Sequence, residues 1–75
     1  MRAYVLVNVR TGEERQIKKL LTNTPGITRA EMTFGPYDMI VQVEAPDLAA
    51  LGKLVSGTIR SAPGVENTLT CLAVE

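Results

Sequence analysis

An α+β fold made of two successive strand-helix-strand units is predicted by this sequence of 75 residues. The main observation is an internal repeat, in which residues 24–27 (TPGI) recur as residues 62–65 (APGV). Each copy follows a segment with helical periodicity and precedes a segment with the alternation typical of a strand. Two such units form the split β-α-β arrangement, so the expected architecture is a ferredoxin-like βαββαβ domain with a four-stranded antiparallel sheet.

The first strand is predicted over residues 4–9, because the side chains alternate between two faces that are both largely apolar. One face carries Val5, Val7 and Val9, and the other carries Tyr4, Leu6 and Asn8.

A helix is expected to follow from Thr11, since Thr11 and Glu14 have the spacing of a capping box. Its apolar stripe consists of Ile17, Leu20 and Leu21. The helix is expected to end before the Pro-Gly turn of residues 25–26.

A β-hairpin is predicted over residues 27–45. Its first strand, residues 27–34, has one polar side, which is typical of a sheet edge; that side carries Arg29, Glu31 and Thr33. A tight connection at residues 35–37 leads to the third strand, residues 38–45. In the split topology, strands one and three are central, and the second strand lies beside the third.

The second helix is expected to begin at a cap formed by Pro46 and Asp47 and to end before Pro63. Its apolar positions are Leu48, Leu51, Val55 and Ile59. Gly52 and Gly57 are unfavourable inside a helix, and they fit either a tolerated surface position or the close approach of another backbone. The last strand is predicted over residues 65–74.

Composition limits the function. The chain forms a single domain, residues 1–75, with eight basic and eight acidic residues and three aromatic residues, which argues against a nucleic-acid-binding surface. Without histidine and with one cysteine, Cys71, neither an internal disulfide nor a metal site is expected. We expect no cofactor and no catalysis, with Cys71 as a small buried hydrophobic residue. A core this small is expected to need oligomerisation for stability.

No apolar run approaches the length that spans a bilayer, and the beginning of the chain lacks a signal-peptide pattern. We therefore expect a cytoplasmic protein without a membrane partner.

Residues 35–38 (GPYD) and 67–70 (NTLT) are the best candidates for a binding site. A turn that offers a carboxylate, a phenol and free N–H groups could bind the ammonium and carboxylate of an amino acid. The alternative is a structural turn, in which Asp38 accepts hydrogen bonds from nearby backbone. In the split topology the two segments need not touch within one subunit, although a subunit interface could bring them together.

The order of these motifs resembles the effector-binding domain of the Lrp/AsnC (feast/famine) transcriptional regulators across essentially the whole chain. The matching positions are Gly35-x-Tyr37-Asp38, Pro46-Asp47, Ile59-Arg60 and Pro63-Gly64-Val65-x-x-Thr68-x-Thr70. The resemblance implies a ligand-binding domain of the RAM type, paired sheet to sheet in a dimer, with an effector bound where dimers meet in a ring. The family's N-terminal helix-turn-helix has no counterpart here, so the chain resembles a stand-alone form without direct DNA binding.

The resemblance also implies a set of effector-binding residues, which lie around the hairpin, at the start of the second helix and along the last strand. They are Met32, Gly35, Tyr37, Asp38, Leu48, Thr68, Thr70, Leu72 and Ala73. The implied partners are a small-molecule effector such as an amino acid, other copies of the chain, and full-length regulators of the same family. Sheet-to-sheet pairing would bury Tyr4, Leu6 and Ile40, which are expected on the face opposite the helices.

Three alternatives remain open. The chain could be a purely structural assembly partner of full-length regulators. It could be a small enzyme of the dimeric α/β-barrel type, although that would need a polar interior. It could also be a domain of the ACT type, whose ligand-binding turn would be residues 8–12.

Overall fold

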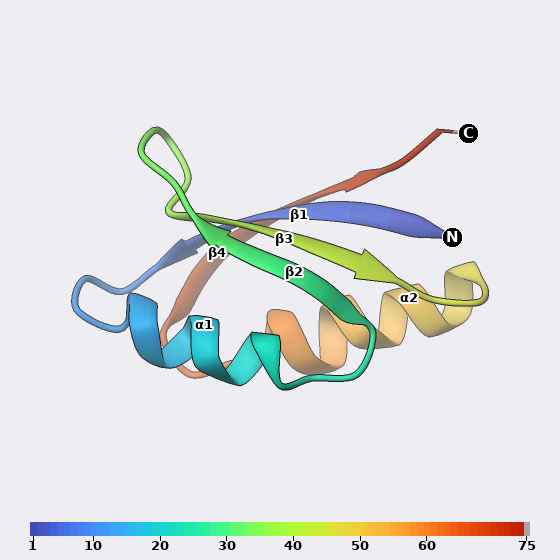
Figure 1. Cartoon of the computed structure of the whole chain (residues 1–75), viewed down its shortest axis with the longest axis horizontal. Helices are drawn as coiled ribbons and strands as arrows, with labels where there is room; N and C mark the ends of the chain where they lie inside the picture. The colour runs from blue at the N-terminus through green and yellow to red at the C-terminus, as the bar shows by residue number, and fades with distance from the viewer. Residues whose placement is uncertain (75) are drawn as a thin grey trace.

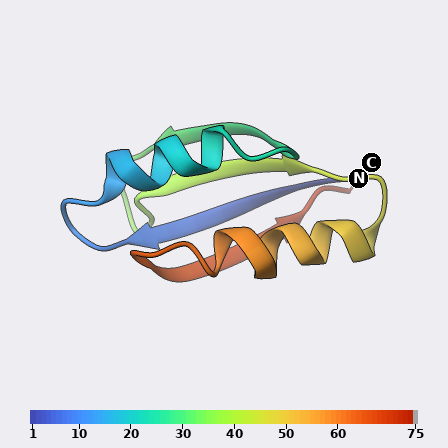
Figure 2. The same ribbon diagram turned by 90° about the horizontal axis from the view of Figure 1, so that it is seen from below.

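The computed structural model describes residues 1–74 and confirms the ferredoxin-like βαββαβ fold. The elements are β1 (Arg2–Val9), α1 (Glu14–Thr22), β2 (Ile27–Met32), β3 (Met39–Glu44), α2 (Leu48–Leu54), the π-helical segment η1 (Val55–Ile59) and β4 (Val65–Leu72). The sheet is antiparallel with strand order β2-β3-β1-β4, so β1 and β3 are central, as expected. Both helices cover the same face of the sheet (Figures 1 and 2). No helix in the described part of the chain is long and apolar enough to cross a membrane.

The core lies between the sheet and the two helices. Alternate residues of the central strands, including Val5, Val7 and Val41, point toward the helices and are fully buried. The helices contribute Ile17 and Leu21 from α1, and further buried side chains come from the second helix: Leu51, Val55 and Ile59. The alternate side chains of the strands and the apolar stripes of the helices therefore pack together in one apolar layer.

The opposite face of the sheet is open and partly apolar. Leu6 lies between Ile40 on β3 and Leu69 on β4, and Tyr4 lies opposite Cys71. Tyr4 and Ile40 are 37% and 38% exposed, which confirms the expected placement on the face away from the helices. The prediction that Cys71 is buried is wrong, because alternation along β4 puts Cys71 on this uncovered face.

The two Pro-Gly turns have the same structure. In the first, the Ile27 N–H donates to the Thr24 carbonyl at 3.1 Å, and in the second the Val65 N–H donates to the Ala62 carbonyl at 3.1 Å. The central glycines have φ values of +94° and +98°, the left-handed conformation that a turn with Pro-Gly at its centre requires. The sequence repeat thus corresponds to a repeated structural unit.

The two helices begin differently. Asp47 caps α2 as predicted, because its Oδ1 accepts a hydrogen bond of 2.8 Å from the Ala50 N–H. The predicted capping box at Thr11 is wrong: α1 begins at Glu14, and the Glu14 carboxylate accepts instead from the Gly12 N–H at 2.8 Å. Gly12 has a φ of +93°, so the backbone turns before the helix can start.

The second helix changes its winding after Leu54. The Arg60 N–H donates to the Val55 carbonyl at 2.9 Å, the five-residue spacing of a π-helix. Leu51, Val55 and Ile59 are buried as expected, whereas Leu48 is exposed. Apart from its chain neighbours and the backbone of its own helix, a Cβ atom added to Gly52 or Gly57 would meet no atom within 4 Å. Within one copy, neither glycine is needed for a close approach.

Candidate functional site

A groove runs between the second helix and the edge strand β4. It consists of two adjoining hollows of about 460 and 210 Å³, both lined by Val55 and Thr70. The larger hollow is polar, and its further lining residues are Arg60, Val65, Glu66, Asn67 and Thr68. The smaller hollow is mainly apolar, and its further lining residues are Leu48, Leu51, Gly52, Ser56 and Leu72. We call the two together the α2–β4 groove.

The register of the sheet explains why alternate residues of β4 line this groove. Thr68 lies opposite Val7, Thr70 opposite Val5, and Leu72 opposite Ala3. Those partners on β1 are all buried under the helices, so the three residues of β4 also face the helical side. At the sheet edge they are only partly covered, which leaves the groove accessible.

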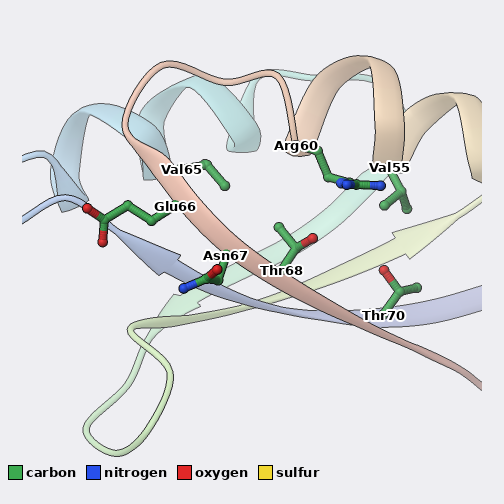
Figure 3. Close-up of a pocket in the computed structure, with 7 residues that line it drawn as sticks. All are labelled: Val55, Arg60, Val65, Glu66, Asn67, Thr68 and Thr70. Atoms are coloured by element: carbon green, nitrogen blue, oxygen red, sulfur yellow. The ribbon is translucent and has the colours of Figure 1, made fainter.

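Arg60 lies at the polar end of the groove. Figure 3 shows its side chain extending from the helix toward Val55, while Thr68 and Thr70 point toward the helix from β4. The other arginines with an ion pair contact Glu44, Glu13 and Glu31. Arg60 has no ion-pair partner among residues 1–74, and the Glu66 carboxylate points away from it (Figure 3).

The loop between β2 and β3 forms a second candidate region, which we call the hairpin region (residues 32–38). The loop is closed by hydrogen bonds from the Thr33 N–H to the Asp38 carbonyl, 2.9 Å, and from the Thr33 Oγ1 to the Tyr37 carbonyl, 2.8 Å. Asp38 also holds the end of β1, because its Oδ2 accepts from the Val9 N–H at 2.9 Å. Asp38 therefore has a structural role in this region.

The hairpin region exposes apolar surface. The loop projects from the sheet on the side away from the helices (Figure 1). Phe34 is fully exposed and Met32 is about half exposed. Together with Glu14, Thr33 and Asp38 they line a hollow of about 440 Å³. Apolar side chains left uncovered beside a carboxylate are typical of a contact or binding surface.

The predicted site residues fall into two groups at opposite edges of the sheet. Leu48, Thr70 and Leu72 line one hollow of the α2–β4 groove, and Thr68 lines the adjoining hollow. The hairpin region contains the second group: Met32, Gly35, Tyr37 and Asp38. Ala73 lies beyond the end of β4 and lines a separate hollow with Met1, Arg2 and Pro46. No single copy brings the two groups together.

Sequence reasoning missed several residues of the groove, above all Arg60. Its signal in the sequence was the Ile59-Arg60 motif at the end of the second helix, which entered the family resemblance without a role in the site. Which side chains at a helix end face a neighbouring strand depends on tertiary packing. Within residues 1–74, the structure holds no group of three or more His, Cys, Asp or Glu side chains arranged to bind a metal ion.

The fold and the two edge hollows define a small α+β module of the ferredoxin-like class. The family model described as "Lrp/AsnC ligand binding domain" matches residues 2–75. The chain therefore belongs to the Lrp/AsnC ligand-binding domain family.

Relatives agree with this assignment. The chain is 32% identical over 75 residues to the HTH-type transcriptional regulator FL11 of Pyrococcus horikoshii, covering 100% of this chain and 49% of the regulator. It thus spans about half the length of the curated relatives it matches. The crystal structure of FFRP-DM1 has a TM-score of 0.94 and 32% identity and covers 97% of both chains.

A more distant neighbour shares the fold alone. The transcriptional regulator NMB0573 of Neisseria meningitidis, solved as an L-Met complex, has a TM-score of 0.86 and 18% identity. The match covers 99% of this chain and 49% of that one.

Proposed function

We propose that the chain is a non-enzymatic effector-binding and oligomerisation domain that binds a small molecule, most simply an amino acid. In this proposal it acts in the cytoplasm through assembly with itself or with full-length regulators of its family. The family membership supports the regulatory role, since the curated relatives are transcriptional regulators. The L-Met complex of the Neisseria regulator supports the choice of an amino acid as ligand.

The proposal depends mainly on one observation: the two groups of predicted site residues lie at opposite edges of the sheet, and each lines an open hollow. The α2–β4 groove supplies threonine hydroxyls and leucine side chains. The hairpin region supplies the Asp38 carboxylate with exposed Met32 and Phe34. A complete pocket would form when the hairpin region of one copy meets the groove of another, a head-to-tail contact that can close into a ring.

The open face of the sheet supports dimerisation. Its centre is formed by Tyr4, Leu6, Ile40 and Leu69, and isolated antiparallel sheets commonly present polar residues on a water-facing side. The same face also carries two ion pairs. Arg2 on β1 pairs with Glu44 on β3, and Arg29 pairs with Glu31 along β2. An apolar centre with polar margins fits the face-to-face packing of two sheets.

Calorimetric titration with each of the twenty amino acids, combined with light scattering, tests the proposal. If the pocket is shared between copies, saturating ligand must favour the assembled form by mass action, by about 2.7 kcal/mol per site at a hundredfold excess over Kd. Binding together with a rise in mean mass is the expected result. The experiment requires conditions under which small and large assemblies coexist. Binding without a change in the mass distribution would then mean that the pocket lies within the smaller assembly.

A purely structural role is the second candidate. The open sheet face needs no ligand to form an interface with another copy. The chain also corresponds in length to about half of a full regulator. It could then enter the assemblies of such regulators and bind nothing small. Co-assembly with a full-length regulator in the absence of any calorimetric signal would favour this alternative.

A further inference from the structure

Arg60 and Arg15 form no ion pair within residues 1–74, and of the two only Arg60 lines the α2–β4 groove. The described arginines that form ion pairs each contact a glutamate; they are Arg2, Arg10 and Arg29. Arg60 instead follows η1 and lines the larger hollow of the α2–β4 groove beside Thr68 and Thr70. A guanidinium without an ion-pair partner, beside hydroxyl groups, is suited to bind a carboxylate through two parallel hydrogen bonds.

The groove also has an apolar continuation. The polar hollow adjoins the smaller one through Val55 and Thr70, which line both. The smaller hollow is bordered by Leu48, Leu51 and Leu72, while Gly52 contributes no side chain there and leaves space open. A ligand with its charged end at Arg60 would therefore extend an aliphatic tail between α2 and β4.

We propose that Arg60 binds the carboxylate of an aliphatic carboxylic acid whose tail lies in the apolar end of the α2–β4 groove. This inference rests on the proposed effector-binding function and assigns a specificity-determining residue to it. The groove would contact the carboxylate and the tail of such a ligand. It presents no acidic side chain beside Arg60 that could bind an ammonium group, since Glu66 points away (Figure 3). Recognition of an ammonium group is then left to the Asp38 carboxylate of another copy.

Three probes separate these parts of a ligand. L-leucine carries the carboxylate, the ammonium and a branched tail. L-leucinamide lacks the carboxylate, and 4-methyl-2-oxopentanoate lacks the ammonium. Each is titrated calorimetrically into the wild-type protein and into the variants Arg60→Gln and Arg60→Lys. Lys53→Gln is the matched control, because it also removes one positive charge, at a residue of α2 that does not line the groove.

Arg60→Gln is expected to weaken the binding of both carboxylate ligands, L-leucine and 4-methyl-2-oxopentanoate, by roughly 10- to 100-fold. This is the effect of losing a hydrogen bond to a charged group. Arg60→Lys should retain part of the affinity, since a lysine keeps the charge without the planar pair of donors. Lys53→Gln should bind like the wild type. Leucinamide should bind the wild type weakly and be insensitive to Arg60→Gln.

Two results would overturn the role of Arg60 while leaving the proposed function intact. One is leucine binding to Arg60→Gln with wild-type affinity. The other is leucinamide binding the wild type as tightly as leucine. If the wild type binds none of the twenty amino acids and none of these probes, the effector-binding function itself fails and the role of Arg60 with it. Because Arg60 is exposed, the substitution is not expected to impair folding.

Discussion

Asp38 combines a structural contact with a place in the proposed effector site. Its Oδ2 accepts a hydrogen bond from the Val9 N–H and so ties the β2–β3 loop to the end of β1. The expectation that Asp38 serves binding more than folding stays a prediction. Because of the hydrogen bond to Val9, an alanine variant would also change the stability of the protein. A variant that keeps the hydrogen bond but removes the charge is therefore needed.

Asp38→Asn is expected to keep the stability of the protein, because the amide oxygen can still accept from the Val9 N–H. Effector binding should weaken by about 1.5–3 kcal/mol, since the charge-assisted bond to a ligand ammonium is lost. Asp38→Ala should in addition lower the free energy of unfolding by about 1–3 kcal/mol through the unpaired Val9 N–H. Calorimetry and urea denaturation measure the two effects. Normal binding by Asp38→Asn would show that Asp38 is structural only.

At Gly64 the backbone conformation favours glycine, and two side-chain ends also crowd the position. Gly64 has a φ of +98°, and a Cβ there would lie 2.7 Å from Oε1 of Glu13 and 2.9 Å from Cδ1 of Ile17. Gly64→Ala is expected to lower the free energy of unfolding by about 2–4 kcal/mol, from backbone strain plus overpacking. Gly12→Ala is the control: its φ is +93° but the space around it is open, so about 1–2 kcal/mol is expected. Equal losses in urea denaturation would contradict this account.

At the scale of elements, α2 depends on its N-terminal cap. Asp47→Ala removes the acceptor for the Ala50 N–H and should lower the free energy of unfolding by about 1 kcal/mol. Asp47→Asn keeps an oxygen at the same position and should cost at most a few tenths of a kcal/mol. Thermal or urea denaturation of both variants checks this. A loss of the same size for Asp47→Asn would mean that charge, and not the cap hydrogen bond, stabilises the helix start.

The elements themselves were largely predictable because each depends on local periodicity. Alternation identified β1 and β3, and the repeated Pro-Gly turns marked where α1 and the second helix end. The errors arose where two local arrangements compete. Glu14 can reach back to Thr11 or to Gly12, and the left-handed conformation of Gly12 decides for the latter. The π-helical winding of η1 was not predictable, because Val55 and Ile59 have the four-residue spacing of an ordinary α-helical stripe.

The candidate site was predictable only in part, for the same reason. Thr68, Thr70 and Leu72 share a face because they alternate along one strand, and the hairpin region is continuous in sequence. The approach of Arg60 to β4 depends on how the second helix packs on the sheet, which no local pattern reports. Cys71 was misplaced because an apolar residue in a strand can face either the core or the uncovered side of the sheet.

At the scale of the whole molecule, the open sheet face is expected to mediate dimerisation. Ile40→Glu places a charge at the centre of this face, opposite Leu6, and should convert a dimer into the 8.1 kDa monomer. Leu20→Glu is the matched control: Leu20 on α1 is similarly exposed but lies on the helical side, so the mass should not change. Sedimentation equilibrium at micromolar concentration measures both. A wild-type mass of 8.1 kDa would contradict the dimer directly.

In the proposed shared pocket, one copy supplies the hairpin region and another supplies the α2–β4 groove. Complementation between two variants that each bind weakly is the test of this arrangement. Asp38→Asn impairs the hairpin region, and Thr70→Trp fills the groove at an exposed strand position that tolerates an aromatic residue. Each variant alone should bind the best amino-acid ligand weakly in calorimetric titrations.

After the two variants are mixed and allowed to exchange subunits, a pocket that joins an intact hairpin region to an intact groove should reappear. At random mixing, roughly a quarter of the sites combine the two intact halves. Wild-type affinity should return at that fraction of sites. No recovery after verified subunit exchange, or wild-type binding by either variant alone, would contradict a pocket shared between copies.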